Sequence, residues 1–116
     1  LAYTAMVTLN KHIMVVDGQK QCADKKFNIL DDPYFSPDRN HVAYIAGHGD
    51  KGEFYLVVNG HVLPTTYGGF FKDTPLVFDD DNTFHTIGMR EPGPKFLLIE
   101  VEIPENAKLE TDLSDL

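Results

Sequence analysis

The chain has 116 residues, 42% of them hydrophobic, which suits one domain with a modest core and excludes a disordered chain. Its formal net charge is −8, from 18 acidic and 10 scattered basic residues, which argues against a nucleic-acid-binding surface. One cysteine, Cys22, excludes an internal disulfide and a Cys-x-x-Cys zinc pattern, so both a periplasmic and a cytoplasmic location stay open.

Short strands dominate the predicted secondary structure. They are rich in β-branched and aromatic residues and are bounded by Gly, Pro, Asn and Asp. The predicted strands cover residues 2–8, 12–16, 41–46, 53–58, 75–78 and 95–103. Helical spacing occurs only at the end, where Leu109, Leu113 and Leu116 would share one helical face. Residues 105–116 are therefore expected to form an acidic tail or a short helix.

Two dipeptides predict tight hairpins. Asp17-Gly18 and Asn59-Gly60 each separate two apolar runs, and both suit a type I′ turn, which needs positive φ at its two central residues. Aligning the two turns gives a period of about 42 residues, within the roughly 40–45 residues of a four-stranded propeller blade. The units are then about 1–31, 32–74 and 75–104.

The stretch "VAYIA" after the turn "SPDRN" carries apolar side chains on both faces of a strand. Such a strand fits a position between two neighbouring sheets, as in a propeller. We therefore expect Val42 and Ala43 to be covered on opposite faces of one sheet. The side chains expected to be largely buried are Tyr44, Ile45, Phe54, Leu56, Val58, Phe78 and Leu98.

The stretch "FSPDRNHVAYIAGHGDKGEFYLVVNG" resembles the TolB-type, WD-like propeller repeat. That repeat has an aromatic residue before Ser-Pro-Asp-Gly, an apolar strand, and an aromatic-Val-Val strand that ends in Asp-Gly. The resemblance implies an all-β fold of antiparallel four-stranded blade repeats, about two and a half blades of a β-propeller. The first unit lacks its innermost strand, and the third has "FDDDN" where the motif is expected. Such repeats occur in periplasmic accessory proteins and in the propeller portions of peptidases.

Few residues suggest chemistry. The five histidines occupy different positions in different units, although the repeat register places His85 inside a strand. Asp79, Asp80 and Asp81 are weak candidates for a Ca²⁺ site, but a polar β-turn explains the same residues and is favoured, and the spacing is not that of an EF-hand. There is no Gly-x-Ser-x-Gly elbow or phosphate loop, so we expect no catalytic residues and no cofactor.

An aromatic segment, "TTYGGFF", connects the second and third units. Tyr67, Phe70 and Phe71 have two interpretations: they fill the gap between units, or they form an exposed patch that binds a partner, since aromatic residues are enriched at interfaces.

The sequence favours a non-catalytic protein-interaction or scaffold module. The alternatives are an accessory propeller portion of a larger hydrolase or peptidase, and a calcium-stabilised structural domain. The start at Leu1 suggests a processed or excised piece. Unfinished repeats favour a homo-oligomer, a dimer first, or pairing with the rest of a parent chain, without nucleic acid and without membrane insertion. The expected interface residues are Tyr3, Met6, Ile13, Leu97 and Ile99.

Overall fold

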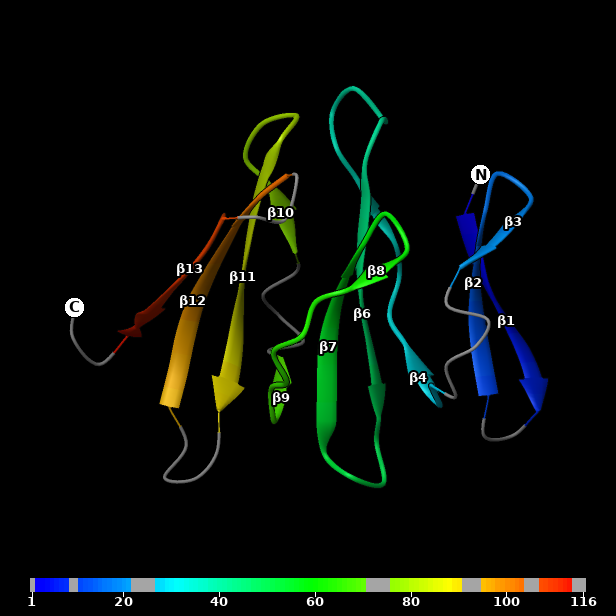
Figure 1. The fold of residues 1–116 in the computed structure, drawn as a ribbon, viewed down its shortest axis with the longest axis horizontal. Helices are drawn as coiled ribbons and strands as arrows, with labels where there is room; N and C mark the ends of the chain where they lie inside the picture. Colours follow the sequence, from blue (N-terminus) through cyan, green and yellow to red (C-terminus); the bar gives the residue numbers. More distant parts are fainter. Residues whose placement is uncertain are drawn as a thin grey trace.

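The computed structural model describes residues 2–8, 11–21, 27–70, 76–90, 95–103 and 107–113. These residues form three antiparallel sheets, without an α-helix, that follow one another along the molecule in chain order (Figure 1). The N-terminal sheet lies at one end of the long axis and the C-terminal sheet at the other. The all-β, antiparallel part of the prediction is confirmed.

Each sheet is built from consecutive strands. The first contains β1 (Ala2–Thr8), β2 (Lys11–Val16) and β3 (Gln19–Gln21). The second has the order β4 (Ile29–Leu30), β6 (Val42–His48), β7 (Glu53–Val58), β8 (His61–Val62), and β5 (Tyr34–Phe35) also pairs with β6. The third has the order β10 (Val77–Phe78), β11 (Thr83–Arg90), β12 (Lys95–Glu102), β13 (Ala107–Asp112), and β9 (Gly69–Phe70) also pairs with β11.

The three sheets share one cross-strand register. Equivalent rows of directly paired residues are Tyr3, Val15 and Lys20 in the first sheet, Tyr44, Val57 and Val62 in the second, and Thr86, Ile99 and Glu110 in the third. The short strands that precede the long ones repeat as well, because β4 and β5 pair with opposite ends of β6 just as β9 and β10 pair with opposite ends of β11. The internal repeat is therefore present in the hydrogen bonding and not only in the sequence.

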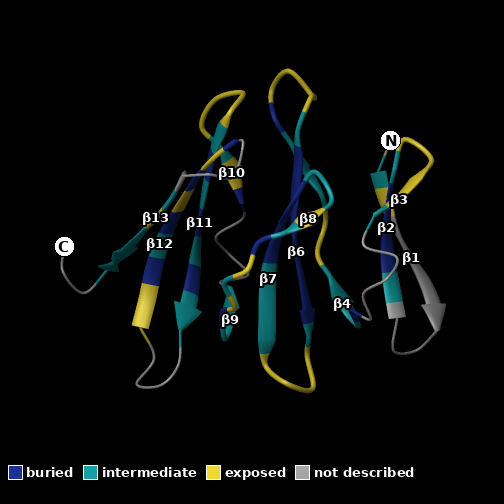
Figure 2. Ribbon diagram, viewed as in Figure 1, coloured by how far each residue is buried: buried dark blue, intermediate teal, exposed yellow. Residues whose placement is uncertain are grey.

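The second sheet is buried on both faces. Ala43 and Ile45 on β6 belong to an apolar cluster with Ile99 and other residues of the third sheet. Val42 and Tyr44, which point the other way, belong to a second cluster with Met14 of the first sheet. Figure 2 shows β6 buried along nearly its whole length. The prediction that Val42 and Ala43 are covered on opposite faces is confirmed.

The predicted core is correct for four of its seven side chains. Tyr44, Ile45, Leu56 and Val58 are buried. Phe54 and Phe78 are only partly buried and pack against the edge of the cluster, and Leu98 is also partly exposed. Phe54 and Phe78 lie near the ends of their strands, and Leu98 lies on the outer face of the third sheet, opposite the buried Leu97 and Ile99.

Both hairpin turns are confirmed. Asp17 and Gly18 have φ values of 50° and 80°, and Asn59 and Gly60 have values of 51° and 83°. Positive φ at both central residues is the signature of a type I′ turn. Each turn joins directly paired residues, Val16 with Gln19 and Val58 with His61.

Replacing Gly60 by valine should lower the free energy of unfolding by more than about 1 kcal/mol, because a β-branched residue is strained at positive φ. Urea unfolding of the purified variant measures the loss. His61→Val, in the adjacent exposed position of β8, is the control and should change stability little. Equal stability of the two variants would mean that the turn tolerates a side chain at this φ.

The expectation of a tail or helix at residues 105–116 is wrong for residues 107–112, which form β13 paired with β12. The leucine spacing suggested a helical face, but the segment alternates with period two. Lys108 and Glu110 share one face of the sheet, and Leu109, which is 60% exposed, lies on the other.

The expected interface residues are only partly on the surface. Ile13, Leu97 and Ile99 are buried within the chain, so their expected exposure is wrong. Ile13 nevertheless alternates with Met14 and lies on the face of β2 that points away from the second sheet. Leu97 and Ile99 point towards the second sheet because they alternate with the exposed Glu100. Tyr3 is 51% exposed, and the side chain of Met6 lies outside the described residues.

Candidate functional site

The segment that connects the second and third sheets is hydrogen-bonded to both. The backbone N–H of Tyr67 donates to the carbonyl of Phe54 on β7, and the N–H of Phe54 donates back, each at 2.9 Å. The next N–H, of Gly68, donates to the carbonyl of Met89 on β11 at 2.7 Å. The connection therefore joins the two sheets through its main chain.

The aromatic side chains of this connection fill space inside the molecule. Tyr67 is only 2% exposed, and its ring contacts Phe70 edge to face at 5.3 Å between centroids. Phe70 is partly buried against the same apolar cluster. The interpretation of an exposed aromatic patch is wrong for Tyr67, whose ring packs in the cluster shared by the two sheets. Phe71 lies outside the described residues.

The hydroxyl of Tyr67 is part of a polar cluster with Arg90, Lys108 and Glu110. It donates to Oε2 of Glu110, and Arg90 Nη2 donates to the same oxygen at 2.8 Å. Lys108 Nζ lies 3.5 Å from that oxygen and donates to the Tyr67 hydroxyl at 3.2 Å and to Thr65 Oγ1 at 2.5 Å. The Glu110 carboxylate thus interacts with two cations and one phenol hydroxyl.

The cluster holds its groups in fixed protonation states. Burial would raise the pKa of Glu110, but hydrogen bonds from Arg90 and Tyr67 outweigh it and lower the pKa to about 2. Burial and the neighbouring Glu110 carboxylate raise the pKa of Tyr67 well above its usual range. Because neither group titrates near neutral pH, this cluster suits structural cross-linking better than proton transfer. A cavity of about 300 Å³ lies beside it, lined by Gly52, Thr66, Tyr67, Gly68 and Arg90.

The three aspartates proposed as metal ligands bind different partners. Oδ1 of Asp80 accepts hydrogen bonds from the backbone of Asn82 and Thr83, each at 2.8 Å, which lowers the pKa of Asp80. Oδ1 of Asp81 accepts from the backbone N–H of Asp38 at 3.0 Å. Asp79 Oδ2 lies 2.8 Å from Nδ1 of His85.

These carboxylates do not converge on one point. In the part of the chain that the structure describes, no group of three or more His, Cys, Asp and Glu residues could hold a metal ion. The geometry agrees with the polar-turn interpretation, in which Asp80 closes its own turn and Asp81 fastens that turn to the preceding repeat.

The "SPDRN" turn uses its polar groups in the same way. Ser36, which is buried, donates from its hydroxyl to Asp38 Oδ1 at 2.6 Å and accepts from the backbone N–H of His41 at 3.1 Å. Asp38 also accepts from the backbone N–H of Asn40 at 3.1 Å. Ser36 is therefore occupied in the turn and is not poised as a nucleophile. Cys22 lies outside the described residues.

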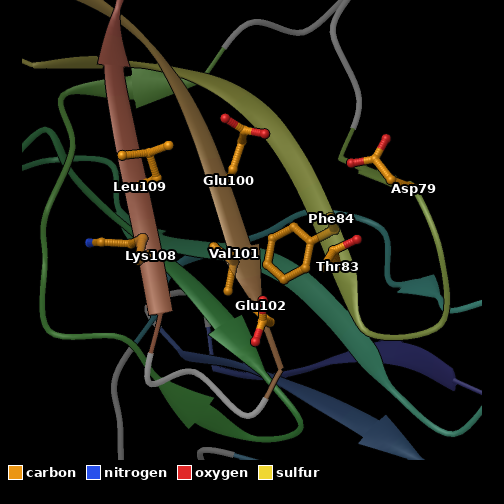
Figure 3. Close-up of a pocket in the computed structure, with 8 residues that line it drawn as sticks. All are labelled: Asp79, Thr83, Phe84, Glu100, Val101, Glu102, Lys108 and Leu109. Carbon is orange, nitrogen blue, oxygen red and sulfur yellow. The ribbon is translucent and has the colours of Figure 1, made fainter.

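A surface hollow on the third sheet has several acidic residues in its lining. Its volume is about 670 Å³, and its lining includes Asp79, Glu100, Glu102 and Leu109. Figure 3 shows Glu100 on β12 and Asp79 on the segment before β11, with Leu109 on the neighbouring β13. These side chains give the outer face of the third sheet a negative charge beside an apolar surface.

No family model, curated protein or solved structure matches the chain. Across the described ranges, no helix is long and apolar enough to cross a membrane. Sequence reasoning identified Tyr67 and Phe70 but missed Arg90, Lys108 and Glu110, which meet Tyr67 only through the pairing of β11, β12 and β13.

Proposed function

We propose that this chain is a non-catalytic protein-interaction or scaffold module built from propeller-type repeats, as its resemblance to the TolB-type repeat implies. The observation that carries the proposal is the burial of the second sheet on both faces by sheets that share its register. Face-to-face stacking of consecutive four-stranded sheets is the packing of propeller blades.

The contacts between repeats also favour a regular array. The turn before β11 is fastened to the turn before β6 by the hydrogen bond from the Asp38 N–H to Asp81, two positions one repeat apart. The chain passes from the second sheet to the third through the buried Tyr67. The second sheet therefore contacts the third through a face, a turn and a connection.

Binding is favoured over catalysis by how the polar groups are used. Ser36, Asp38 and Asp80 are engaged in turns, and Glu110 is fixed by two cations and a phenol. The exposed large apolar side chains include Tyr3 on the first sheet and Phe96 and Leu109 on the third, the two ends of the stack. Phe96 and Leu109 share the outer face of the third sheet, and aromatic residues such as Phe96 are enriched at interfaces.

A photo-crosslinking residue placed at position 96 in the intact native gene product tests the proposal. We expect covalent capture of a second polypeptide segment, identified by mass spectrometry. The control is the same residue at position 51, in an exposed loop between β6 and β7, where little capture is expected. Equal, low capture at both positions would contradict an interaction module. Capture of a hydrolase segment of the same parent chain would favour the accessory-portion alternative.

A further inference from the structure

We propose that a second copy of this chain docks head to tail, so that the outer face of its first sheet packs on the outer face of the third sheet. The inference rests on the proposed stack of repeats and names the partner of that stack. Figure 1 shows the two faces at opposite ends of the molecule, so one copy of the described chain does not bring them together.

The shared register makes the two outer faces equivalent to faces that already pack. On the first sheet, the row that points away from the second sheet is Tyr3, Val15 and Lys20, of which Val15 is buried and Tyr3 and Lys20 are exposed. It is equivalent to the row Tyr44, Val57 and Val62, whose side chains lie in the cluster with Met14 of the first sheet. This outer face of the first sheet is therefore equivalent to the face of the second sheet that packs against the first sheet.

The outer face of the third sheet is equivalent to the opposite side of the same kind of sheet junction. Its row is His85, Glu100 and Leu109. The equivalent row of the second sheet begins with Ala43 and Val58, which pack in the cluster shared with the third sheet. The two outer faces are therefore equivalent to the two sides of a junction that forms twice among the described sheets of each chain.

At the proposed junction between two copies, a pair of opposite charges occupies the positions that hold an apolar contact within the chain. Val16 and Val62 both pack against the cluster between the first and second sheets. By register, the residue equivalent to Val16 on the outer face of the third sheet is Glu100, and the residue equivalent to Val62 on the first sheet is Lys20. Both are exposed, and they carry opposite charges.

The net charges of the two end regions of the chain are also complementary. Residues 1–31 hold four lysines against three aspartates, whereas residues 76–116 hold ten acidic residues against three basic ones. An acidic end and a slightly basic end attract each other in a head-to-tail arrangement and repel in an end-to-end arrangement of two third sheets. The occupant that fits the acidic face is therefore the first sheet of another copy.

A polar contact of the internal junction also has its counterpart. The hydroxyl of Tyr44 donates to Oε1 of Gln21 at 3.0 Å, across the first and second sheets. The equivalent residues at the open junction are Tyr3, whose side chain is half exposed, and Thr111. A hydroxyl from Tyr3 of one copy would donate to the hydroxyl of Thr111 in the other.

Ring closure limits the number of copies. The described residues of each copy form three sheets, and closed propellers have about four to eight blades. Two copies supply six sheets, while three copies would supply nine and exceed that range. A dimer with two identical head-to-tail junctions is therefore the expected assembly.

Sedimentation velocity of the purified chain at micromolar concentration is the test. We expect the native chain to sediment as a dimer, and Glu100→Lys and Lys20→Glu each to lose it, because each variant places like charges at both junctions. Mixing the two variants restores opposite charges at both junctions and should restore a dimer. Lys51→Glu, an exposed charge reversal in the loop between β6 and β7, is the control and should leave the dimer intact.

The outcomes separate this inference from the proposed function. A native chain that stays monomeric, or two variants that stay monomeric when mixed although circular dichroism shows them folded, would overturn docking of a second copy. If position 96 still captures a different polypeptide in that case, the interaction module stands and only the identity of its partner changes.

Discussion

Replacing Phe84 by alanine is expected to lower the free energy of unfolding by about 3–5 kcal/mol. Phe84 is 1% exposed and lies in the cluster between the second and third sheets, with its ring 5.3 Å from that of Phe78. Removing the ring leaves a cavity between two sheets that are each held by their own hydrogen bonds, so the gap closes poorly. Urea unfolding monitored by circular dichroism measures the loss.

Phe96→Ala provides the matched control for this prediction. Phe96 is 39% exposed on the outer face of β12, and its truncation should cost clearly less than that of Phe84. Both variants are compared at the same submicromolar protein concentration, so that association contributes equally. Losses of similar size would mean that the two sheets do not pack through Phe84 as described.

Replacing Glu110 by glutamine should cost about 1–3 kcal/mol at pH 7, since the ion pair is partly screened by solvent, and progressively less as the pH falls towards 2. The folded pKa is about 2 and the ordinary value is 4.5, so ionised Glu110 stabilises the fold above pH 4.5. That contribution is lost as falling pH approaches the folded pKa. The substitution also leaves Arg90 and Lys108 without their shared carboxylate.

Unfolding of the native chain and the variant at pH 7 and at pH 2.5 gives the two differences to compare. Glu102→Gln, on the exposed outer face of the same sheet, should have little effect at either pH. A difference between native chain and Glu110→Gln that is the same at both pH values would show that the carboxylate is not held by Tyr67 and Arg90.

Local chemistry made much of the fold predictable. The predicted strands 2–8 and 53–58 match β1 and β7 in their bounds, and both turns have the expected φ values. Asp-Gly and Asn-Gly determine a turn by themselves, because few other pairs tolerate positive φ at both positions. Apolar residues on both faces of a strand similarly predict that both faces are buried, as is observed for β6.

Features set by pairing were harder to predict. The polar residues His85, Thr86 and Arg90 hide the strand β11 from a search for apolar runs, although the repeat register placed His85 within a strand. Leu109 suggested a helix, but its segment is held by the ladder to β12.

The candidate site shows the same limit. Tyr67 was recognisable as an aromatic residue in a connection, but its partners were not. Arg90 and Glu110 follow it by 23 and 43 positions, and only the β11–β12–β13 ladder brings them to its hydroxyl. A sequence pattern has no signal for such a cluster, since a single arginine and a single glutamate on short strands read as ordinary surface charges.

The stacking of each sheet only on its neighbours in the chain has a consequence for folding cooperativity. The stability of such an array is close to a sum of one term for each sheet and one for each junction between neighbours. The second sheet takes part in both internal junctions, whereas the first and third each take part in one. In a dissociated single copy, fraying should therefore begin independently at the first and third sheets, and the ladder between β6 and β7 should be the last to open.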